Sequence, residues 1–210
     1  MTKTADFFDL KEFKHAVLFE GIEHVWESLA HIKAYLASYN FCIHGQVDPR
    51  SYLVYPELIS IGKGTVVEAG AYIQGPCIIG ENCQVRHGAY IRGGVITGDG
   101  VVIGHTTEAK NAIFLNGAHA AHFSYIGDSI LGNKVNLGAG VKCANFRLDQ
   151  RKIHVHFEGK KYSTELRKLG AILGDGSQIG CNSVTNPGTL LKKSTFLQPG
   201  SFIRFQQQSV

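Results

Sequence analysis

Aliphatic residues recur at every sixth position of this chain between residues 61 and 103, and only Thr97 interrupts the series. Its members are Ile61, Val67, Ile73, Ile79, Val85, Ile91 and Ile103. A period of six matches neither the 3.6-residue repeat of a helix nor the alternation of a half-buried strand. It is typical of the hexapeptide repeat of a β-helix, in which three hexapeptides form one triangular coil. We therefore predict a mainly β fold, a single-stranded parallel β-helix.

A second series, four residues after the first, contains only small or β-branched residues, and glycine directly follows several aliphatic positions. This series comprises Thr65, Ala71, Cys77, Cys83, Ala89, Val95 and Val101. The aliphatic pattern returns as Leu173, Ile179, Thr185, Leu191, Leu197 and Ile203. Each coil of such a fold buries its inner face only by stacking on the next one. We expect the aliphatic residues to fill the interior and the small residues to fit the tight space near its corners.

Residues 1–45 lack the six-residue period, and most of the first forty residues are predicted to be helical, with a break at Gly21. Apolar residues recur there at three- and four-residue intervals, which is typical of one buried helix face. They are Ile22, Val25, Trp26, Leu29, Ile32 and Leu36. The predicted organisation is an N-terminal helical arm, 1–45, followed by a β-helix domain, 46–210.

Residues 147–168 interrupt the β-helix domain. Ile153, Val155 and Phe157 alternate with histidines and lead into Glu158-Gly159, which predicts an inserted hairpin loop. The segment carries seven basic residues against three acidic ones. It is either a solvated basic loop or a loop that faces a phosphate.

Composition narrows the class of protein. No stretch approaches eighteen consecutive apolar residues, and no apolar segment follows the first residues, so neither a transmembrane helix nor a secretory signal is predicted. The five cysteines form no CxxC pair, which indicates reduced thiols and a cytoplasmic protein. A net charge of +4 is too small to indicate nucleic acid but suits anionic small molecules.

Polar residues interrupt the repeat between residues 86 and 146. Arg92 and Lys110 are eighteen residues apart, the length of one coil, so both should project from one face about 4.8 Å apart. Such a pair either clamps a phosphate or is solvated. His122 has small neighbours on its N-terminal side, and a neutral imidazole there could accept a proton from an attacking amine or hydroxyl. A single histidine among ten is also commonly structural.

These motifs resemble the acetyltransferase domain of the bifunctional N-acetylglucosamine-1-phosphate uridylyltransferase / glucosamine-1-phosphate acetyltransferase. The matching stretches are Ile91-Arg92-Gly93, Glu108-Ala109-Lys110, Ala121-His122-Phe123-Ser124-Tyr125-Ile126-Gly127-Asp128, Val135-Asn136-Leu137-Gly138-Ala139-Gly140 and Cys143-Ala144-Asn145-Phe146. Residues 145–188 are similar to archaeal sugar-1-phosphate nucleotidylyltransferases with a fused acetyltransferase half. The resemblance covers about residues 55–204 and implies a left-handed coil.

The resemblance also implies a role for each matching residue. His122 would be the general base, and acetyl-CoA would be the co-substrate, with no metal required. Sugar-phosphate ligands would be Arg92, Lys110, Tyr125 and Lys168, while Glu108, Asn136 and Asn145 would hold the sugar. Ala139 and Cys181 would face the CoA arm. The family forms homotrimers with sites between subunits.

The chain departs from the family in three ways. Phe146 stands where the bacterial enzymes have a tyrosine, and Cys181 replaces a serine. Fewer than sixty residues precede the coil, too few for a nucleotidylyltransferase half. We therefore expect an amino sugar 1-phosphate acetyltransferase without that half, with a separate protein as a candidate for the nucleotidyl-transfer step.

Three other functions stay open. One is a γ-carbonic-anhydrase-like metal enzyme, for which His87, His105, His119 and His122 lie in the right region but with unsuitable spacing. Another is an acyltransferase that uses an acyl carrier protein and a nucleotide sugar. The last is a catalytically silent scaffold, since fold alone does not establish function.

Overall fold

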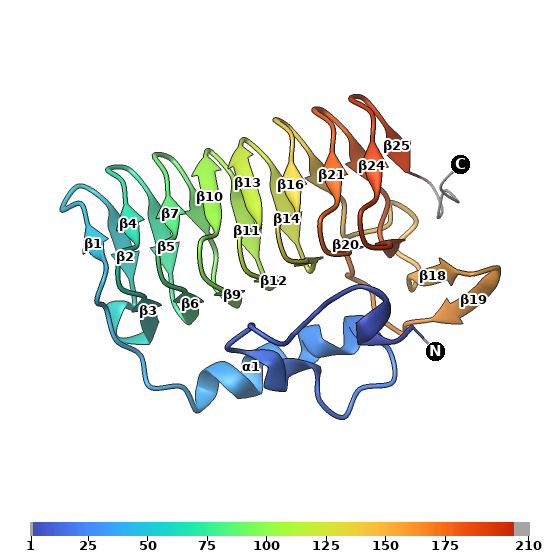
Figure 1. Ribbon diagram of the computed structural model, residues 1–210, viewed down its shortest axis with the longest axis horizontal. Helices are drawn as coiled ribbons and strands as arrows, with labels where there is room; N and C mark the ends of the chain where they lie inside the picture. The colour runs from blue at the N-terminus through green and yellow to red at the C-terminus, as the bar shows by residue number, and fades with distance from the viewer. Residues whose placement is uncertain (1, 204–210) are drawn as a thin grey trace.

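The computed structural model describes residues 2–203 and confirms the fold as a left-handed parallel β-helix (Figure 1). Three parallel sheets form the sides of a triangular prism. The predicted boundaries at residues 45 and 210 stay predictions, and residues 204–210 lie outside the described residues.

The strands of each sheet come from successive coils. The first sheet contains β1 (Gln46–Val47), β4 (Val66–Val67), β7 (Gln84–Val85), β10 (Val102–His105), β13 (His119–His122), β16 (Asn136–Leu137), β21 (Gln178–Ile179) and β24 (Phe196–Leu197). The second contains β2 (Tyr52–Val54), β5 (Tyr72–Gln74), β8 (Tyr90–Ile91), β11 (Glu108–Lys110), β14 (Tyr125–Gly127), β17 (Lys142–Cys143), β22 (Val184–Thr185) and β25 (Phe202–Ile203). The third contains β3 (Ile59–Ile61), β6 (Cys77–Ile79), β9 (Val95–Thr97), β12 (Ala112–Phe114), β15 (Ile130–Leu131), β20 (Ala171–Leu173) and β23 (Thr189–Leu191).

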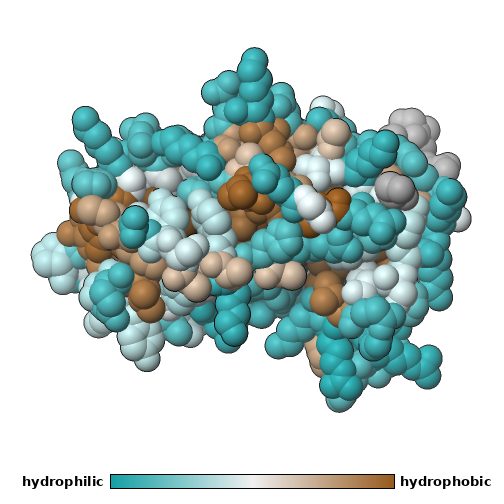
Figure 2. Space-filling model, turned by 90° about the horizontal axis from the view of Figure 1, so that it is seen from below, coloured by the Kyte–Doolittle hydropathy of each residue, from teal (hydrophilic) through white to brown (hydrophobic). Residues whose placement is uncertain are grey.

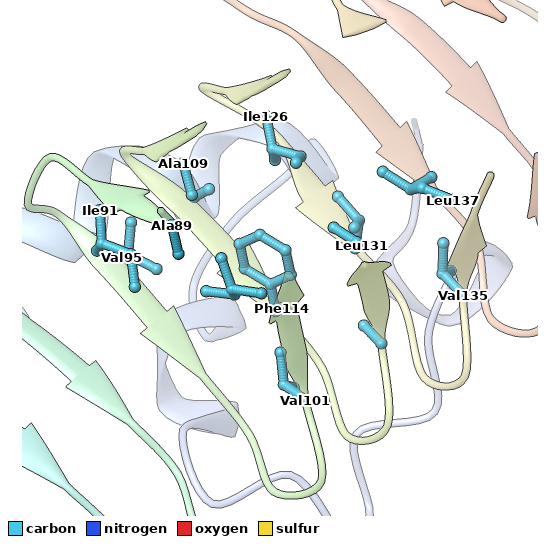
Figure 3. Packing of buried hydrophobic residues seen from close by; sticks show 14 of the residues in the cluster. Ala89, Ile91, Val95, Val101, Ala109, Phe114, Ile126, Leu131, Val135 and Leu137 are labelled. Carbon is cyan, nitrogen blue, oxygen red and sulfur yellow. The ribbon is translucent and has the colours of Figure 1, made fainter. Parts of the chain in front are cut away.

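The predicted interior is confirmed, because the aliphatic series and its small companions between residues 61 and 103 are all buried in one cluster or beside it. Figure 3 shows Ile91, Ala109, Phe114 and their neighbours converging between the sheets. Thr97, the exception in the series, is also buried, and its Oγ1 accepts a hydrogen bond from the Gly80 amide at 2.8 Å. That bond satisfies the hydroxyl inside the core.

The coil is shorter where the polar residues gather. Inward positions are five residues apart from Ala109 to Phe114 and again from Ile126 to Leu131, so the strand register is 17 rather than 18 residues. Both shortened steps lie at the corner between the second and third sheets. Because these two steps are one residue short, a strict six-residue period does not describe residues 104–146.

The arm is less helical than predicted. Its only α-helix within residues 2–203 is α1 (Ser28–Ala37), preceded by short 3-10 turns at Thr4–Asp6, Ala16–Phe19 and Val25–Glu27; another turn, Pro56–Leu58, precedes β3. Tertiary packing overrides helix formation before Gly21, because the aromatic side chains there pack against one another within the apolar cluster that covers the third sheet. These side chains are Phe7, Phe8, Phe13 and Phe19. The predicted apolar stripe from Val25 to Leu36 is buried as expected.

The arm covers the outer face of the third sheet, and Figure 2 shows this side with apolar patches among hydrophilic side chains. The sheet offers an apolar row on its outer side, so both of its faces are buried. The row comprises Ile78, Ile96, Ile113, Ile130, Ile172 and Leu190. Polar contacts fix the arm along the coils: the Asp9 amide donates to Asp175 Oδ2 at 2.7 Å, and Lys14 pairs with Glu81 at 2.8 Å.

The inserted segment forms the predicted hairpin, with β18 (His154–Phe157) antiparallel to β19 (Lys160–Ser163). It leaves the coil at the corner between the second and third sheets and packs beside the arm (Figure 1). None of the helices in residues 2–203 is long and apolar enough to cross a bilayer.

Candidate functional site

Arg92 and Lys110 lie one strand apart on the outer face of the second sheet, as the coil length predicted. Their neighbours Ile91 and Ala109 are register partners and are fully buried, so the two cations that follow them face outward. Lys110 is the more enclosed, with 19% of its side chain exposed against 44% for Arg92. The two cations therefore form a short ladder at the corner with the third sheet.

Each cation is paired with a carboxylate. Arg92 Nη1 donates to Glu108 Oε1 at 2.8 Å, and this hydrogen bond raises the pKa of the guanidinium. Lys110 Nζ donates to Asp128 Oδ2 at 3.1 Å. A phosphate bound here would share these cations with the carboxylates. The pairs hold both cations in place, which reduces the entropy lost on binding.

Asp128 is the centre of a buried polar cluster that the sequence did not single out. Its carboxylate accepts hydrogen bonds from Lys110, from Asn111 Nδ2 at 2.8 Å and from Asn145 Nδ2. Asp128 is 7% exposed and Asn145 is 8% exposed. The signal that could have revealed it is its position in the shortened corner, directly after Gly127.

Tyr125 joins this cluster from the start of β14. A Cβ on Gly127 would lie 2.6 Å from the Tyr125 hydroxyl and 2.7 Å from Asn145 Nδ2, so glycine leaves space for both groups in their present positions. Burial raises the pKa of the Tyr125 phenol, and the charges of Glu108 and Asp128 raise it further. The hydroxyl therefore stays protonated at neutral pH and is available as a donor.

His122 ends β13 at the corner between the first and second sheets. It pairs in register with His105 below it, and its carbonyl accepts from the Gly140 amide at 3.1 Å on the next coil. By the same register Ala139 lies above His122, and Cys181 lies above Ala139. The predicted base and the two predicted CoA-facing residues thus form one column along this corner, and His122 and Cys181 are exposed.

The remaining predicted site residues lie on either side of the His122 column. Lys168 forms an antiparallel bridge with Phe146, next to Asn145, at the corner of the Arg92–Lys110 ladder. Asn136 lies on the outer face of the first sheet, in register with His119. A single chain therefore presents these residues on two sides of the prism and along the edge between them.

Three of the four histidines of the metal-enzyme alternative lie in one column, while His119 lies at the other end of β13. His87 and His105 are parallel, with ring centroids 6.0 Å apart, and His122 continues their column. Within residues 2–203, no group of three or more His, Cys, Asp or Glu side chains is arranged to hold a metal ion.

The sequence model of the GMPPB C-terminal domain matches residues 73–194, which is more than half of the chain. The chain belongs to this family. The matched range contains every predicted site residue from Arg92 to Cys181, and the prediction of a hexapeptide acetyltransferase-type domain is confirmed.

The names of individual relatives also indicate an acetyltransferase-type domain. The bifunctional sugar-1-phosphate nucleotidylyltransferase/acetyltransferase of Sulfurisphaera tokodaii is 36% identical over 101 residues, covering 48% of this chain and 25% of that protein. A GlmU bifunctional protein of Methanococcus maripaludis is 35% identical over 94 residues, covering 45% and 23%. The putative uncharacterized acetyltransferase YaiX of Escherichia coli K12 is 38% identical over 141 residues, covering 67% and 61%. The chain thus spans about a quarter of the bifunctional relatives. These names support an acyltransferase.

A solved structure shares the fold. The UDP-N-acetylglucosamine acyltransferase of Francisella novicida superposes with a TM-score of 0.55 over 77% of this chain and 62% of that one, at 14% identity. At that identity the likeness concerns the β-helix alone.

Proposed function

We propose that this protein transfers an acetyl group from acetyl-CoA to the amine of an amino sugar 1-phosphate. The proposal rests on two features at opposite edges of the second sheet: the column of His122, Ala139 and Cys181, and the Arg92–Lys110 ladder. A base on one edge of a sheet and a cation pair on the other edge suit a ligand with an amine and a phosphate.

In the proposed reaction His122 accepts a proton from the sugar amine as its nitrogen attacks the thioester carbonyl. The new C–N bond forms a tetrahedral intermediate, whose oxyanion a backbone amide near Ala139 would stabilise. Collapse breaks the C–S bond, and the imidazolium returns its proton to the CoA thiolate. The products are the N-acetyl sugar phosphate and free CoA, so atoms and charge balance.

The cationic residues and the residues that hold the sugar take no part in bond making or breaking. Arg92, Lys110 and Lys168 would bind the phosphate, with the Tyr125 hydroxyl as a further donor, and Glu108 and Asn145 would orient the sugar. Fixing the amine beside the thioester removes much of the entropic barrier to a bimolecular reaction.

We also propose that the site is completed by a second copy of the chain in a homotrimer. Asn136 supports this, because it faces outward from the first sheet while Tyr125 and Arg92 face outward from the second. Mixed oligomers of His122→Ala and Asn136→Ala subunits would recover activity if the two residues act in one site across an interface. Recovery should approach a quarter to a third of the wild-type rate per subunit, and no recovery would refute the shared site.

The direct test is a thiol-release assay with acetyl-CoA across a panel of amino sugar 1-phosphates and the matching unphosphorylated sugars. His122→Ala should reduce kcat by about 10²–10⁴ because general base catalysis contributes that much. Its melting temperature should not change, because His122 is exposed. Equal use of phosphorylated and unphosphorylated sugars would refute the phosphate site. We also propose that the reaction takes place in the cytoplasm, in the formation of UDP-N-acetylglucosamine.

A further inference from the structure

A cavity of about 830 Å³ lies between the inserted hairpin and the corner of the second and third sheets. It is of the size that holds drug-sized or nucleotide-sized ligands. Its lining includes cationic side chains, two histidines of β18 and the turn after β22. None of the roles proposed above uses this cavity.

The hairpin wall of the cavity is firmly supported. Along β18 the residues alternate, so that Val155 and Phe157 are buried against the arm while His154 and His156 line the cavity. At the opposite wall a Cβ on Gly188 would lie 2.7 Å from Ile153 Cγ2, so the hairpin and this turn are in close contact. Because its walls are packed, the cavity is preformed rather than a gap under a loose loop.

The charge of the lining is strongly positive. Arg147, Arg151, Lys152 and Lys161 face one carboxylate, that of Asp149. Asp149 pairs with Arg147 at 2.5 Å, and Lys152 pairs with Glu165, which is not part of the lining. Within residues 2–203, no salt bridge involves Arg151 or Lys161. These two cations are therefore available for an anion.

The lining also includes exposed apolar side chains. Phe146 is 43% exposed and Leu148 is fully exposed. An aromatic ring beside cations suits a nucleotide, because a base can stack on the ring while the phosphates bind the cations. The bridge between Phe146 and Lys168 places this cavity directly beside Asn145 and the proposed phosphate ligands.

We propose that this cavity binds a nucleoside diphosphate group, with Arg151 and Lys161 as phosphate ligands and Phe146 against the base. Two molecules could carry that group: the CoA donor, through its adenosine 3′-phosphate 5′-diphosphate, or a nucleotide-linked acceptor sugar. The inference goes beyond the proposed reaction and does not require it.

Calorimetric titration of the full chain with ADP, UDP, AMP and UMP tests the proposal without any acetyl transfer. The diphosphates should bind at least ten-fold more tightly than the monophosphates, because each added charge-assisted hydrogen bond contributes about that factor. Lys161→Ala and Arg151→Ala should each weaken diphosphate binding about ten-fold. Lys160→Ala and Arg167→Ala are matched controls, since they remove the same charges from the hairpin segment but do not line the cavity; they should change affinity less than two-fold. Melting temperatures of all four variants verify the fold.

Competition experiments identify which molecule supplies the nucleoside diphosphate group that binds in the cavity. Displacement of bound ADP by acetyl-CoA but not by a UDP-sugar assigns the cavity to the donor, and the converse assigns it to the acceptor. His122→Ala should bind the diphosphates as the wild type does, so loss of acetyl transfer and loss of this site are separable. Absence of diphosphate binding, or equal losses in Lys161→Ala and Lys160→Ala, would overturn the proposal.

Discussion

Replacing Asp128 by Asn tests whether the buried cluster holds the candidate site together. The change keeps the shape of the side chain but removes the charge that pairs with Lys110 at 3.1 Å. It also puts an NH₂ group where donors from Asn111 and Asn145 now converge on the carboxylate. Only 9% of the Asp128 side chain and 19% of the Lys110 side chain are exposed, so water compensates little.

The size of the effect follows from these contacts. Removing one member of a buried ion pair costs about 3–5 kcal/mol, and a hydrogen bond to a charged group contributes about 1.5–3 kcal/mol. Because asparagine keeps one acceptor oxygen, we expect Asp128→Asn to lower the free energy of unfolding by about 3 kcal/mol. For a chain of this length that corresponds to roughly 6–12 °C in melting temperature.

The assay is urea unfolding followed by circular dichroism, with Glu108→Gln as the matched control. Glu108 pairs with Arg92 on the same sheet, but 32% and 44% of the two side chains are exposed. Such a surface pair contributes only about 0–1 kcal/mol. Adding Lys110→Met to Asp128→Asn should recover part of the loss, because the unpaired ammonium disappears. Equal losses in Asp128→Asn and Glu108→Gln would refute the argument.

Three further predictions concern binding, the arm and pH. Arg92→Ala should raise the KM of the sugar phosphate about ten-fold with little change in kcat, because the side chain binds the phosphate but does no bond chemistry; a kcat effect alone would contradict this assignment. Ile113→Ala should lower the free energy of unfolding by about 2–5 kcal/mol, since Ile113 is fully buried under the arm, and a loss below 1 kcal/mol would show that the arm is not docked. Burial lowers the pKa of His15 from 6.5 to about 4, so the unfolded chain binds the extra proton between these values. Stability from His15 is complete above pH 6.5 and is lost as the pH falls toward 4, by about 3 kcal/mol; urea unfolding of His15→Gln should lack this dependence.

The interior of the β-helix could be predicted from the sequence, because each inward position repeats a residue type at a fixed spacing. Even Thr97 fits, since its hydroxyl finds a backbone amide. The shortened coils were not predicted, because losing one residue at the Lys110 corner moves every later inward position by one. That corner contains Asn111 and Asp128. Because the register there was not predicted, the polar cluster around Asp128 was not predicted either.

The arm could be predicted only in part. The helical stripe correctly marked Trp26 and its neighbours as buried, but the aromatic residues before Gly21 are held in a cluster with residues distant in sequence, which no local pattern indicates. The outward apolar row of the third sheet, including Ile96 and Ile113, was not identified from the sequence as a docking surface. The site residues were predicted because their types and spacing match a known family, and they stay predictions, while their division between two sides of the prism required coordinates.

The position of the arm has a consequence for the order of events during synthesis. The arm leaves the ribosome before the β-helix, but Phe7 lies against Phe157, and the Asp9 amide bonds to Asp175, so its binding surface is complete only after these residues are made. At ~5–20 residues per second the arm waits roughly 8–35 s with its aromatic side chains uncovered. Coils that form early are likewise left with a bare apolar side. Nascent chains stalled before residue 150 should therefore be recognised by chaperones that bind exposed aromatic segments.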